Sequence, residues 1–332
     1  MKKGYVTIKT VAKELNISVS TVSRVINKKP DVSEETKKKV LTKIEELGYI
    51  RNVTATMMRN KMSKTIGVIF ESEFDPFFSE ILGGIEKGVS KYNYRMILMN
   101  TKLREEEGKT AINTLMEHRV DGIIIIPTDP NISYIQKLVE KKFPIVIIGR
   151  NYDKFDVDEI YTDDYFGGQI AAEYLFSKGK RKLLMINSSS ENSASMSREK
   201  GFISKLSEMG LKCTVIKDKN SDYGEVFNII RSLYFEKRCY PFDGIFCFND
   251  MRAFAVINAL RSVNNALLKE ISVIGYDDIL FSSIFSPKLT TIHIDKQKEG
   301  YEAVKLLTQK ITGRRKFTKK KILKVSLVIR ET

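Results

Sequence analysis

The alternation of short apolar runs with amphipathic segments from Thr65 onward constrains the fold more than any other feature of the sequence. Strands buried on both faces appear as near-continuous apolar runs, and a helix between two strands lets the second run parallel to the first. We therefore predict an α/β fold in which parallel sheets flanked by helices form two lobes that meet near residues 161–166. The expected strands are 66–70, 96–99, 123–126, 145–148, 183–186, 214–216, 244–248 and 271–274, and the expected helices include 78–92, 170–177, 201–209 and 226–235.

Residues 1–48 show a different periodicity, which predicts a small all-α domain of three short helices. Thr7, Ser18 and Ser33 are expected to cap these helices, because a hydroxyl oxygen can accept a hydrogen bond from a free N–H of the first turn. Asn16 lies between the first two helices, where it can adopt the left-handed conformation of a tight turn. Two helices joined in this way are typical of a helix-turn-helix DNA-binding domain.

Basic residues are concentrated in the same part of the chain. The chain carries 56 Lys and Arg against 41 Asp and Glu, and residues 1–64 hold 15 of the basic but only 6 of the acidic residues. The net charge of this segment is therefore +9 (15 minus 6), against +6 for the rest of the chain. Such an imbalance favours a polyanionic partner such as double-stranded DNA, although a solvated basic surface would give the same count.

The second expected helix carries residue types that can read DNA. The start of such a helix faces base edges in the major groove, where arginine can bind guanine, serine can donate or accept, and valine can contact a thymine methyl group. Small polar residues beside them suit phosphate oxygens. A three-helix packing module with solvated polar faces is the alternative. The predicted DNA-binding residues of this segment are Thr7, Ser18, Val19, Ser20, Thr21, Ser23, Arg24 and Asn27.

The sequence contains no secretory signal or membrane span. Its start is basic without a following apolar stretch, and its longest apolar runs are far shorter than the ~20 residues that a span needs. The cysteines form no CxxC pair and the histidines lie far apart, which indicates no metal site and a reducing compartment. We therefore expect a cytoplasmic protein without metal or cofactor. The residues concerned are Cys213, Cys239, Cys247, His118 and His293.

Patterns of common enzymes are also missing from the sequence. There is no glycine-rich phosphate loop, no GxSxG motif and no histidine beside a nucleophile, so we expect no enzymatic activity. Gly83 and Gly84 lie within a helical pattern, where close packing is the simpler interpretation. Cys247 lies within an expected strand and is expected to be a core residue.

Polar residues follow several expected strands, at the edge where open α/β sheets bind ligands. Arg150, Asn249 and Asp277 each come shortly after a strand, and Phe77 and Phe78 follow the first. Charged groups can bind pairs of hydroxyls while aromatic rings lie against the apolar face of a sugar, so this set suits a hydroxylated ligand. Arg150 as a surface cation is the alternative, and one of the two phenylalanines is expected to pack in the core.

Motifs along nearly the whole chain resemble the lactose/galactose repressor (LacI/GalR) family. The stretch ISVSTVSRVIN at residues 17–27 and the stretch ISVIGYDD at 271–278 are two of them. The others lie at 7–12, 32–36, 44–49, 64–69, 76–78, 119–123, 249–250 and 289–292. The resemblance implies a helix-turn-helix domain at 1–48, a hinge at 49–64, and a sensor domain like the periplasmic binding proteins at 65–332. The implied lobes comprise about 65–162 with 293–321, and about 163–290 with 322–332.

The resemblance further implies that residues 50–58 form a hinge helix on operator DNA, where an apolar side chain inserts into the minor groove. Met58 stands at the position of that wedge, and Ala55 at the small position that lets paired hinge helices approach. Asn52 is predicted to contact DNA as well. Arg51 replaces the usual proline, which removes a fixed φ at the start of the hinge. Without DNA, an unstructured linker is expected.

In the sensor domain, Arg198 matches the arginine that grips the effector, Asp277 the aspartate that accepts effector hydroxyls, and Asn249 a polar pocket residue. An ion pair between the lobes is the alternative for Arg198 and Asp277. Residues 305–325 contain nine basic residues and no acid. Contact with DNA is possible for them, but a solvated surface is the expectation.

These observations predict a homodimeric repressor of carbohydrate-utilisation genes that binds a pseudo-palindromic operator and responds to a sugar or oligosaccharide between its lobes. A global catabolite regulator with a phosphoprotein corepressor is one alternative, and it would need a patch for an acidic partner on the first lobe. A sugar-binding protein without a DNA role is another, and it would need an export signal. Purine-type effectors occur on the same scaffold, so the sequence leaves the ligand open.

Overall fold

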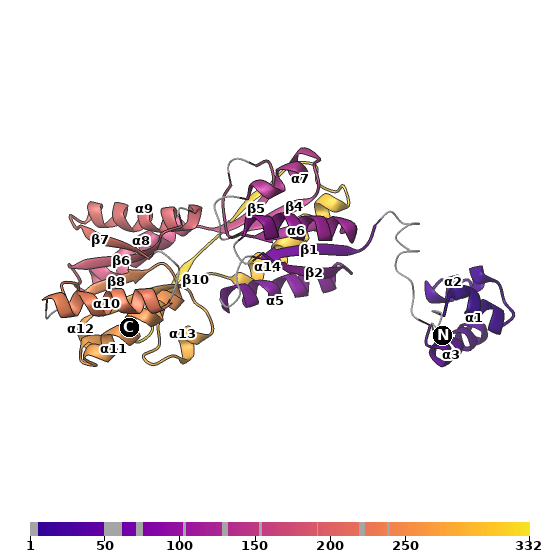
Figure 1. Cartoon of the computed structure of the whole chain (residues 1–332), viewed down its shortest axis with the longest axis horizontal. Coiled ribbons are helices and arrows are strands. Elements are labelled where there is room, and N and C mark those ends of the chain that lie inside the picture. The colour runs from indigo at the N-terminus through magenta and orange to yellow at the C-terminus, as the bar shows by residue number, and fades with distance from the viewer. Residues whose placement is uncertain are drawn as a thin grey trace. The chain divides into compact units, whose positions relative to one another are not determined.

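The computed structural model describes residues 6–49, 62–70, 76–101, 104–127, 132–152, 155–190, 192–218, 223–237 and 240–332. Contacts between residues divide the chain into two units, residues 1–63 and residues 64–332. The first unit consists of short helices, and the second, which we call the sensor domain, is built from two α/β lobes (Figure 1).

The first unit is a three-helix bundle around a small apolar core. The side chains of Thr7, Ser18 and Ser33 each accept a hydrogen bond from the backbone N–H three residues further on, which confirms the predicted caps. Asn16 has a φ of 53° in the turn after the first helix, as predicted. The helices are α1 (Ile8–Glu14), α2 (Val19–Ile26) and α3 (Glu34–Leu47), and their buried residues are Val11, Ala12, Val22, Val25 and Val40.

The first lobe of the sensor domain is built on a six-stranded sheet. Its strands are β1 (Thr65–Phe70), β2 (Arg95–Asn100), β3 (Gly122–Ile126), β4 (Ile145–Ile148), β5 (Asp158–Thr162) and β11 (Lys320–Leu323). All neighbours are parallel, in the order β11-β5-β4-β3-β1-β2. Every residue of β3 and β4 is buried, as their unbroken apolar runs predict.

The second lobe repeats this plan with one difference. Its strands are β6 (Leu183–Ser188), β7 (Cys213–Asp218), β8 (Gly244–Cys247), β9 (Ser272–Asp277), β10 (Thr290–His293) and β12 (Ser326–Val328). They lie in the order β12-β10-β9-β8-β6-β7, and β12 alone is antiparallel to its neighbour.

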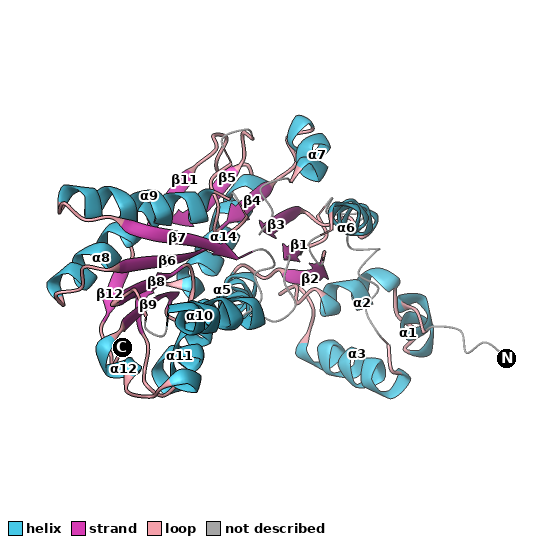
Figure 2. Cartoon of the chain, turned by 60° about the vertical axis from the view of Figure 1, so that its left-hand side comes forward, coloured by secondary structure: helices cyan, strands magenta, loops and turns pink. Residues whose placement is uncertain are grey.

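Helices cover the sheets of both lobes (Figure 2). In the first lobe α5 packs against α14, and in the second α8 packs against α9. The first-lobe helices are α5 (Pro76–Lys91), α6 (Glu105–Glu117), the 3₁₀ turn η1 (Ser133–Ile135), α7 (Gln136–Glu140) and α14 (Lys296–Ile311). The second-lobe helices are α8 (Asp164–Ser177), α9 (Ser193–Glu208), α10 (Tyr223–Lys237), α11 (Asp250–Val263), α12 (Leu267–Glu270) and α13 (Phe281–Ile284).

Glycines let the paired helices of each lobe approach closely. A Cβ atom added to Gly84 of α5 would lie 2.0 Å from the carbonyl oxygen of Gln297 in α14. One added to Gly201 of α9 would lie 2.0 Å from the carbonyl oxygen of Tyr165 in α8. Gly83, by contrast, has nothing within 4 Å of an added Cβ. The close-packing interpretation therefore holds for Gly84 but not for Gly83.

The chain passes between the lobes three times, after β5, after β10 and after β11. Strand β11 stays in the first sheet through Leu323, slightly beyond the change of lobe implied near residue 321. The four strands that flank these passages were not among those predicted. Their short sequences mix polar and apolar residues, so they lack the continuous apolar run that marks a buried parallel strand.

The basic stretch 305–325 is only partly a solvated surface, which corrects the sequence expectation. Arg315 donates two hydrogen bonds, of 2.6 and 2.5 Å, to the carboxylate of the fully buried Asp158 in β5. Lys321 lies 2.8 Å from a carboxylate oxygen of Glu302 in α14. Asp158 is far from the stretch in sequence, and Glu302 lies just before it. A count of charges within residues 305–325 therefore could not identify either acid as a partner.

Candidate DNA interface and effector site

Helix α2 presents three predicted base-reading residues to solvent, two in its first turn and one in its last. Val19 is 41% exposed, and Ser20 and Arg24 are also exposed. A guanidinium nitrogen of Arg24 lies 3.5 Å from a carboxylate oxygen of Asp31, and both side chains are more than half exposed. An exposed ion pair of this kind stabilises a protein by only about 0–1 kcal/mol, so DNA can displace it.

The polar residues beside them are engaged within the unit. The Ser18 hydroxyl oxygen caps α2 and lies 2.6 Å from the Ser20 hydroxyl and 2.8 Å from that of Thr21. Asn27 Nδ2 donates to the carbonyl oxygen of Ser23 at 2.7 Å. These contacts fix the ends of the helix, and the hydroxyl oxygens keep lone pairs while their protons can reorient toward phosphate.

The predicted hinge residues Asn52, Ala55 and Met58, together with Arg51, lie outside the described residues. Their roles stay predictions. The sensor domain begins directly after this segment, at Lys64.

Arg198 is the centre of the candidate effector site. It extends from α9 and is only 4% exposed. Its Nε donates to Asp164 Oδ1 at 2.8 Å and its Nη1 to the carbonyl oxygen of Phe248 at 2.6 Å, while the guanidinium lies 3.5 Å from the ring centroid of Tyr276. Burial lowers the pKa of Arg198, but the charges of Asp164 and Asp277 raise it more, so the guanidinium stays charged.

Asp277, at the end of β9, is the second predicted effector residue. Its Oδ1 lies 3.7 Å from Arg198 Nη2, and its backbone φ of 107° lies in a region that residues other than glycine rarely adopt. Both residues belong to the second lobe, so the ion pair between them lies within that lobe rather than between the lobes. A hydroxyl that accepts from the guanidinium and donates to the carboxylate would suit this pair.

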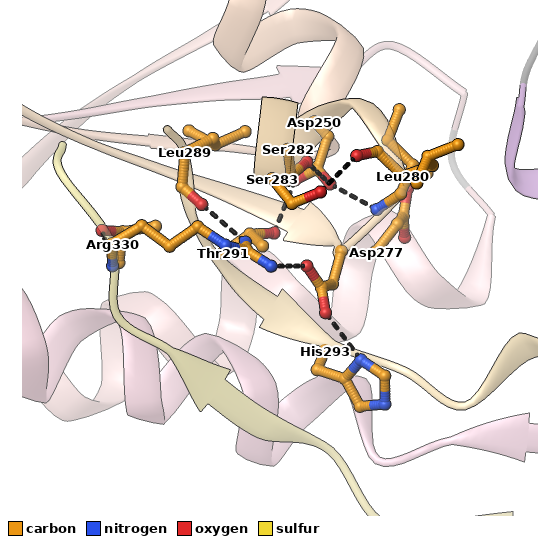
Figure 3. A network of polar contacts seen from close by, with 12 residues as sticks. Asp250, Asp277, Leu280, Ser282, Ser283, Leu289, Thr291, His293 and Arg330 are labelled. Carbon is orange, nitrogen blue, oxygen red and sulfur yellow. Dashed lines mark hydrogen bonds and ion pairs between the residues drawn. The ribbon is translucent and has the colours of Figure 1, made fainter. Parts of the chain in front are cut away.

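Asn249 and Asp250 organise the neighbouring strand end. Asn249 Oδ1 accepts from the N–H three residues further on and caps α11. The carboxylate of Asp250 is fully buried and accepts hydrogen bonds from the Ile279 N–H and from the hydroxyls of Ser282 and Thr291 (Figure 3). Burial raises the pKa of Asp250 to about 6. This network ties α11 to β10 and to the segment that contains α13.

The turn after Asp277 is fixed by residues of both lobes. Lys296 of α14 is buried, and its Nζ donates to the carbonyl oxygens of Asp277 and Asp278. The same Nζ lies 3.4 Å from a carboxylate oxygen of Glu80 in α5. The side chain of Asp278 accepts a hydrogen bond of 2.6 Å from Arg330. A shift of either lobe therefore acts on the backbone of the predicted effector residue.

Arg150 reaches the same junction from the first lobe. Its Nη1 donates to the carbonyl oxygen of Gly149 at 3.1 Å, whereas its Nε is buried and has no acceptor among the described residues. Burial and the charge of Arg198 lower the pKa of Arg150. The alternative of a surface cation was therefore wrong.

The two phenylalanines at the start of α5 differ in environment. Phe78 is buried, and its ring meets that of Phe77 edge to face at a centroid distance of 5.3 Å. Phe77 is partly buried and packs against the apolar clusters of the second lobe. Phe78 is thus the core residue of the pair, and Phe77 forms a contact between the lobes.

Sequence reasoning missed three charged residues at this junction: Asp164, Lys296 and Glu299. Lys296 and Glu299 are 2% and 1% exposed, and they extend the apolar face that Ala303 and Leu307 form further along α14. Charged residues that continue an apolar face at helical spacing are a signal that could have found them. Burial and the charge of nearby Asp164 raise the pKa of Glu299 to about 8, although the charges of Lys296, Arg198 and Arg150 lower it.

The Glu299→Gln variant should lose part of the pH dependence of stability. Folded Glu299 keeps its proton up to about pH 8, whereas the unfolded chain releases it near the usual value of 4.5. The free energy of unfolding therefore falls as pH rises from 4.5 to 8, and glutamine, which has nothing to release, removes that fall. We expect the variant to gain a few kcal/mol relative to the wild type at pH 8 compared with pH 5, measured by urea unfolding.

Glu302→Gln on the same helix is the control. Burial raises the pKa of Glu302, but the hydrogen bond and charge of Lys321 and the charge of Lys305 lower it more, so the net pKa is low. This group stabilises the protein at every pH above its usual pKa of 4.5, so its loss should lower stability by a similar amount at pH 5 and at pH 8 and leave the pH dependence between them nearly unchanged. Equal pH dependence in Glu299→Gln and the wild type would contradict the assignment.

Among the described residues, no three His, Cys, Asp or Glu side chains are grouped so that they could hold a metal ion. No helix in the described ranges is long and apolar enough to cross a membrane. Cys247 is fully buried, and burial raises its pKa, which confirms it as a core residue.

Two family models match the chain. One, described as bacterial regulatory proteins of the lacI family, matches residues 7–52. The other, described as periplasmic binding proteins and the sugar-binding domain of the LacI family, matches residues 63–331.

Individual proteins are similar over nearly the whole chain. The HTH-type transcriptional repressor PurR of Aliivibrio salmonicida is 33% identical over 309 residues, 92% of each chain, and that of Photobacterium profundum is 31% identical over 329 residues, 98% of each. The structure of the lac repressor dimer bound to operator and the anti-inducer ONPF has a TM-score of 0.88 at 26% identity, with 99% of each chain covered. A LacI family regulator from Enterococcus faecium with bound ribose has a TM-score of 0.72 at 26% identity, with 80% of this chain and 97% of that chain covered.

Proposed function

Because the chain belongs to the LacI family of bacterial regulatory proteins and is a DNA-binding transcriptional regulator, we propose that it works as a cytoplasmic homodimer on a pseudo-palindromic operator. Each α2 reads one half-site through Val19, Ser20 and Arg24, while the hinge residues Ala55 and Met58 contact the minor groove. The similarity to the lac repressor dimer on its operator supports this arrangement. The protein controls genes of carbohydrate utilisation and has no enzymatic activity.

The effector is a small hydroxylated molecule, a sugar or oligosaccharide, that binds where the lobes meet. The observation that carries this proposal is a pair of buried first-lobe atoms without partners among the described residues, Nε of Arg150 and Oε2 of Glu299. Buried polar groups are nearly always hydrogen-bonded, and a hydroxyl can accept from the first and bond to the second. Arg198 and Asp277 hold the same ligand from the second lobe. The ribose-bound relative supports this choice of ligand.

A ligand held from both lobes can change the angle between them. The two hinge segments of a dimer then separate or approach, which couples effector binding to operator affinity by typically ~1–3 kcal/mol. Lys296 contributes to this coupling, since it contacts Glu80 of the first lobe and the backbone of Asp277 in the second.

Thermal unfolding against a panel of sugars, sugar phosphates and purines tests the effector class. A sugar at 100 times its dissociation constant should stabilise the protein by ~2.7 kcal/mol and raise the unfolding midpoint by several degrees. Asp277→Asn should abolish that rise, because the amide cannot replace the carboxylate that faces Arg198. The exposed Asp156→Asn should keep it. Stabilisation by purines alone, or by no compound of the panel, would contradict the sugar assignment.

A further inference from the structure

The basic stretch that the proposed function leaves unused forms one wall of a cavity in the first lobe. This cavity, of about 420 Å³, opens where α5 and α14 end, beside the first residue of the sensor domain. Its lining includes Lys64, Tyr94, Gln309, Arg314 and Arg315. No aspartate or glutamate is among the described residues that line it. A cavity lined by cations and hydrogen-bond donors but by no acid has the composition of an anion site.

Two of the lining residues carry unsatisfied donors. The Tyr94 hydroxyl and Arg315 Nε are buried and have no partner among the described residues. Tyr94 is only 7% exposed, and burial, with the charge of Asp121, raises its pKa to about 12, so the hydroxyl keeps its proton and can donate. The guanidinium of Arg315 is otherwise fixed by Asp158, which holds this donor in a defined place. Buried donors of this kind call for an acceptor.

The cations of the cavity are placed to supply charge. Lys64 Nζ lies 4.5 Å from the ring centroid of Tyr94, above the residue whose hydroxyl is unsatisfied. Arg314 is exposed and follows the end of α14 by three residues, so its guanidinium can turn toward a ligand without breaking an ion pair described for it. Two acids contact the lining residues without being part of the lining: Asp121 accepts a hydrogen bond from the backbone N–H of Lys64, and Asp158 accepts from Arg315.

We propose that this cavity binds a phosphoryl oxyanion, with Lys64 and Arg314 supplying charge and Tyr94 and Arg315 supplying fixed donors. The anion is either a free phosphate compound or a phosphate of the DNA backbone, because the cavity adjoins the residue at which the sensor domain follows the DNA-binding unit in the chain. The site shares no residue with the effector junction of Arg198 and Asp277, so it is independent of the proposed effector.

The test compares the full-length protein with a Lys64→Gln/Arg314→Gln variant. The control is Lys141→Gln/Lys298→Gln, which removes the same charge from exposed positions of the same lobe. In the first arm, thermal midpoints are measured in inorganic phosphate and in chloride at equal ionic strength. In the second, an operator is selected from random duplexes, and its affinity is measured as a function of salt.

A free phosphate ligand predicts a midpoint rise of a few degrees in phosphate over chloride, present in the wild type and control but lost in the cavity variant. A DNA phosphate predicts instead that the salt dependence weakens: the slope of log K for DNA binding against log salt should be less negative by about 1–2 in the cavity variant than in the control. Equal behaviour of the two variants in both arms would overturn the proposal. Neither arm uses a sugar. The anion site can therefore be disproved while the sugar effector stands, and the sugar effector can be disproved while the anion site stands.

Discussion

Replacing Arg198 with methionine is expected to lower the free energy of unfolding of the sensor domain by about 3–5 kcal/mol. The guanidinium is the hydrogen-bond partner of the Phe248 carbonyl oxygen and the cationic partner of Asp164, whose carboxylate would keep a 3.3 Å hydrogen bond from the Thr162 hydroxyl but lose the positive charge beside it in a buried site. Removing one partner of a buried ion pair costs more than the pair itself contributes, since the remaining charge cannot return to water. Urea unfolding of the full chain measures the change, and stabilisation by any sugar effector should disappear with it.

Two further variants separate charge from packing. Arg95→Met, at an exposed position of β2, is the control and should change stability by less than about 0.5 kcal/mol. Adding Asp164→Leu to Arg198→Met removes the stranded carboxylate and should restore part of the lost stability without restoring effector binding. A loss below about 1 kcal/mol in Arg198→Met would show that Asp164 has another partner for its charge.

Gly84→Ala is expected to destabilise the first lobe by about 3 kcal/mol, a large effect for a single methyl group. The added Cβ would lie 2.0 Å from the carbonyl oxygen of Gln297, and this obstacle is backbone that cannot rotate away. The helices α5 and α14 must therefore separate, and the apolar contacts between them are lost. Denaturant unfolding followed by circular dichroism measures the effect.

Gly83→Ala is the matched control, one residue away on the same helix. Its added Cβ meets nothing within 4 Å, and alanine favours a helix over glycine by about 0.5–1 kcal/mol, so this variant should be slightly more stable than the wild type. The opposite signs of the two substitutions distinguish close packing from a general sensitivity of α5. Equal effects at the two positions would contradict this account.

The sequence was sufficient to predict the α/β core of the sensor domain, because a buried parallel strand such as β3 is apolar at nearly every position. The strands next to the passages between the lobes were not predicted, because they lack such a continuous apolar run. Strand β5 reads Asp-Glu-Ile-Tyr-Thr, and its acids are buried only because Arg315 and Lys320 reach them from far along the chain. A local pattern cannot encode a partner that is more than a hundred residues away.

The candidate effector site was also predicted only in part from the sequence. Asp277 was predicted from its strand end and from the family resemblance, and Arg198 from the resemblance alone; the structure brings them within 3.7 Å of each other. Glu299 was not, because a glutamate in a helix with polar and charged neighbours is usually a solvated residue. Its place on the apolar face of α14 was the one signal in the sequence, and the packing of α14 against the junction shows that the carboxyl group is buried.

The three passages of the chain between the lobes also determine the order in which the protein can be completed during synthesis. The helix-turn-helix unit consists of consecutive residues near the N-terminus, so it can fold as soon as it leaves the ribosome. The first lobe cannot, because α14 and β11 come from the last part of the chain. Its sheet stays without the edge strand β11, and α5 without its partner helix, until residues 296–323 have been synthesised, after the strands β6 to β10 of the second lobe. A nascent chain can therefore hold a folded DNA-binding unit well before it has a sensor domain able to regulate it.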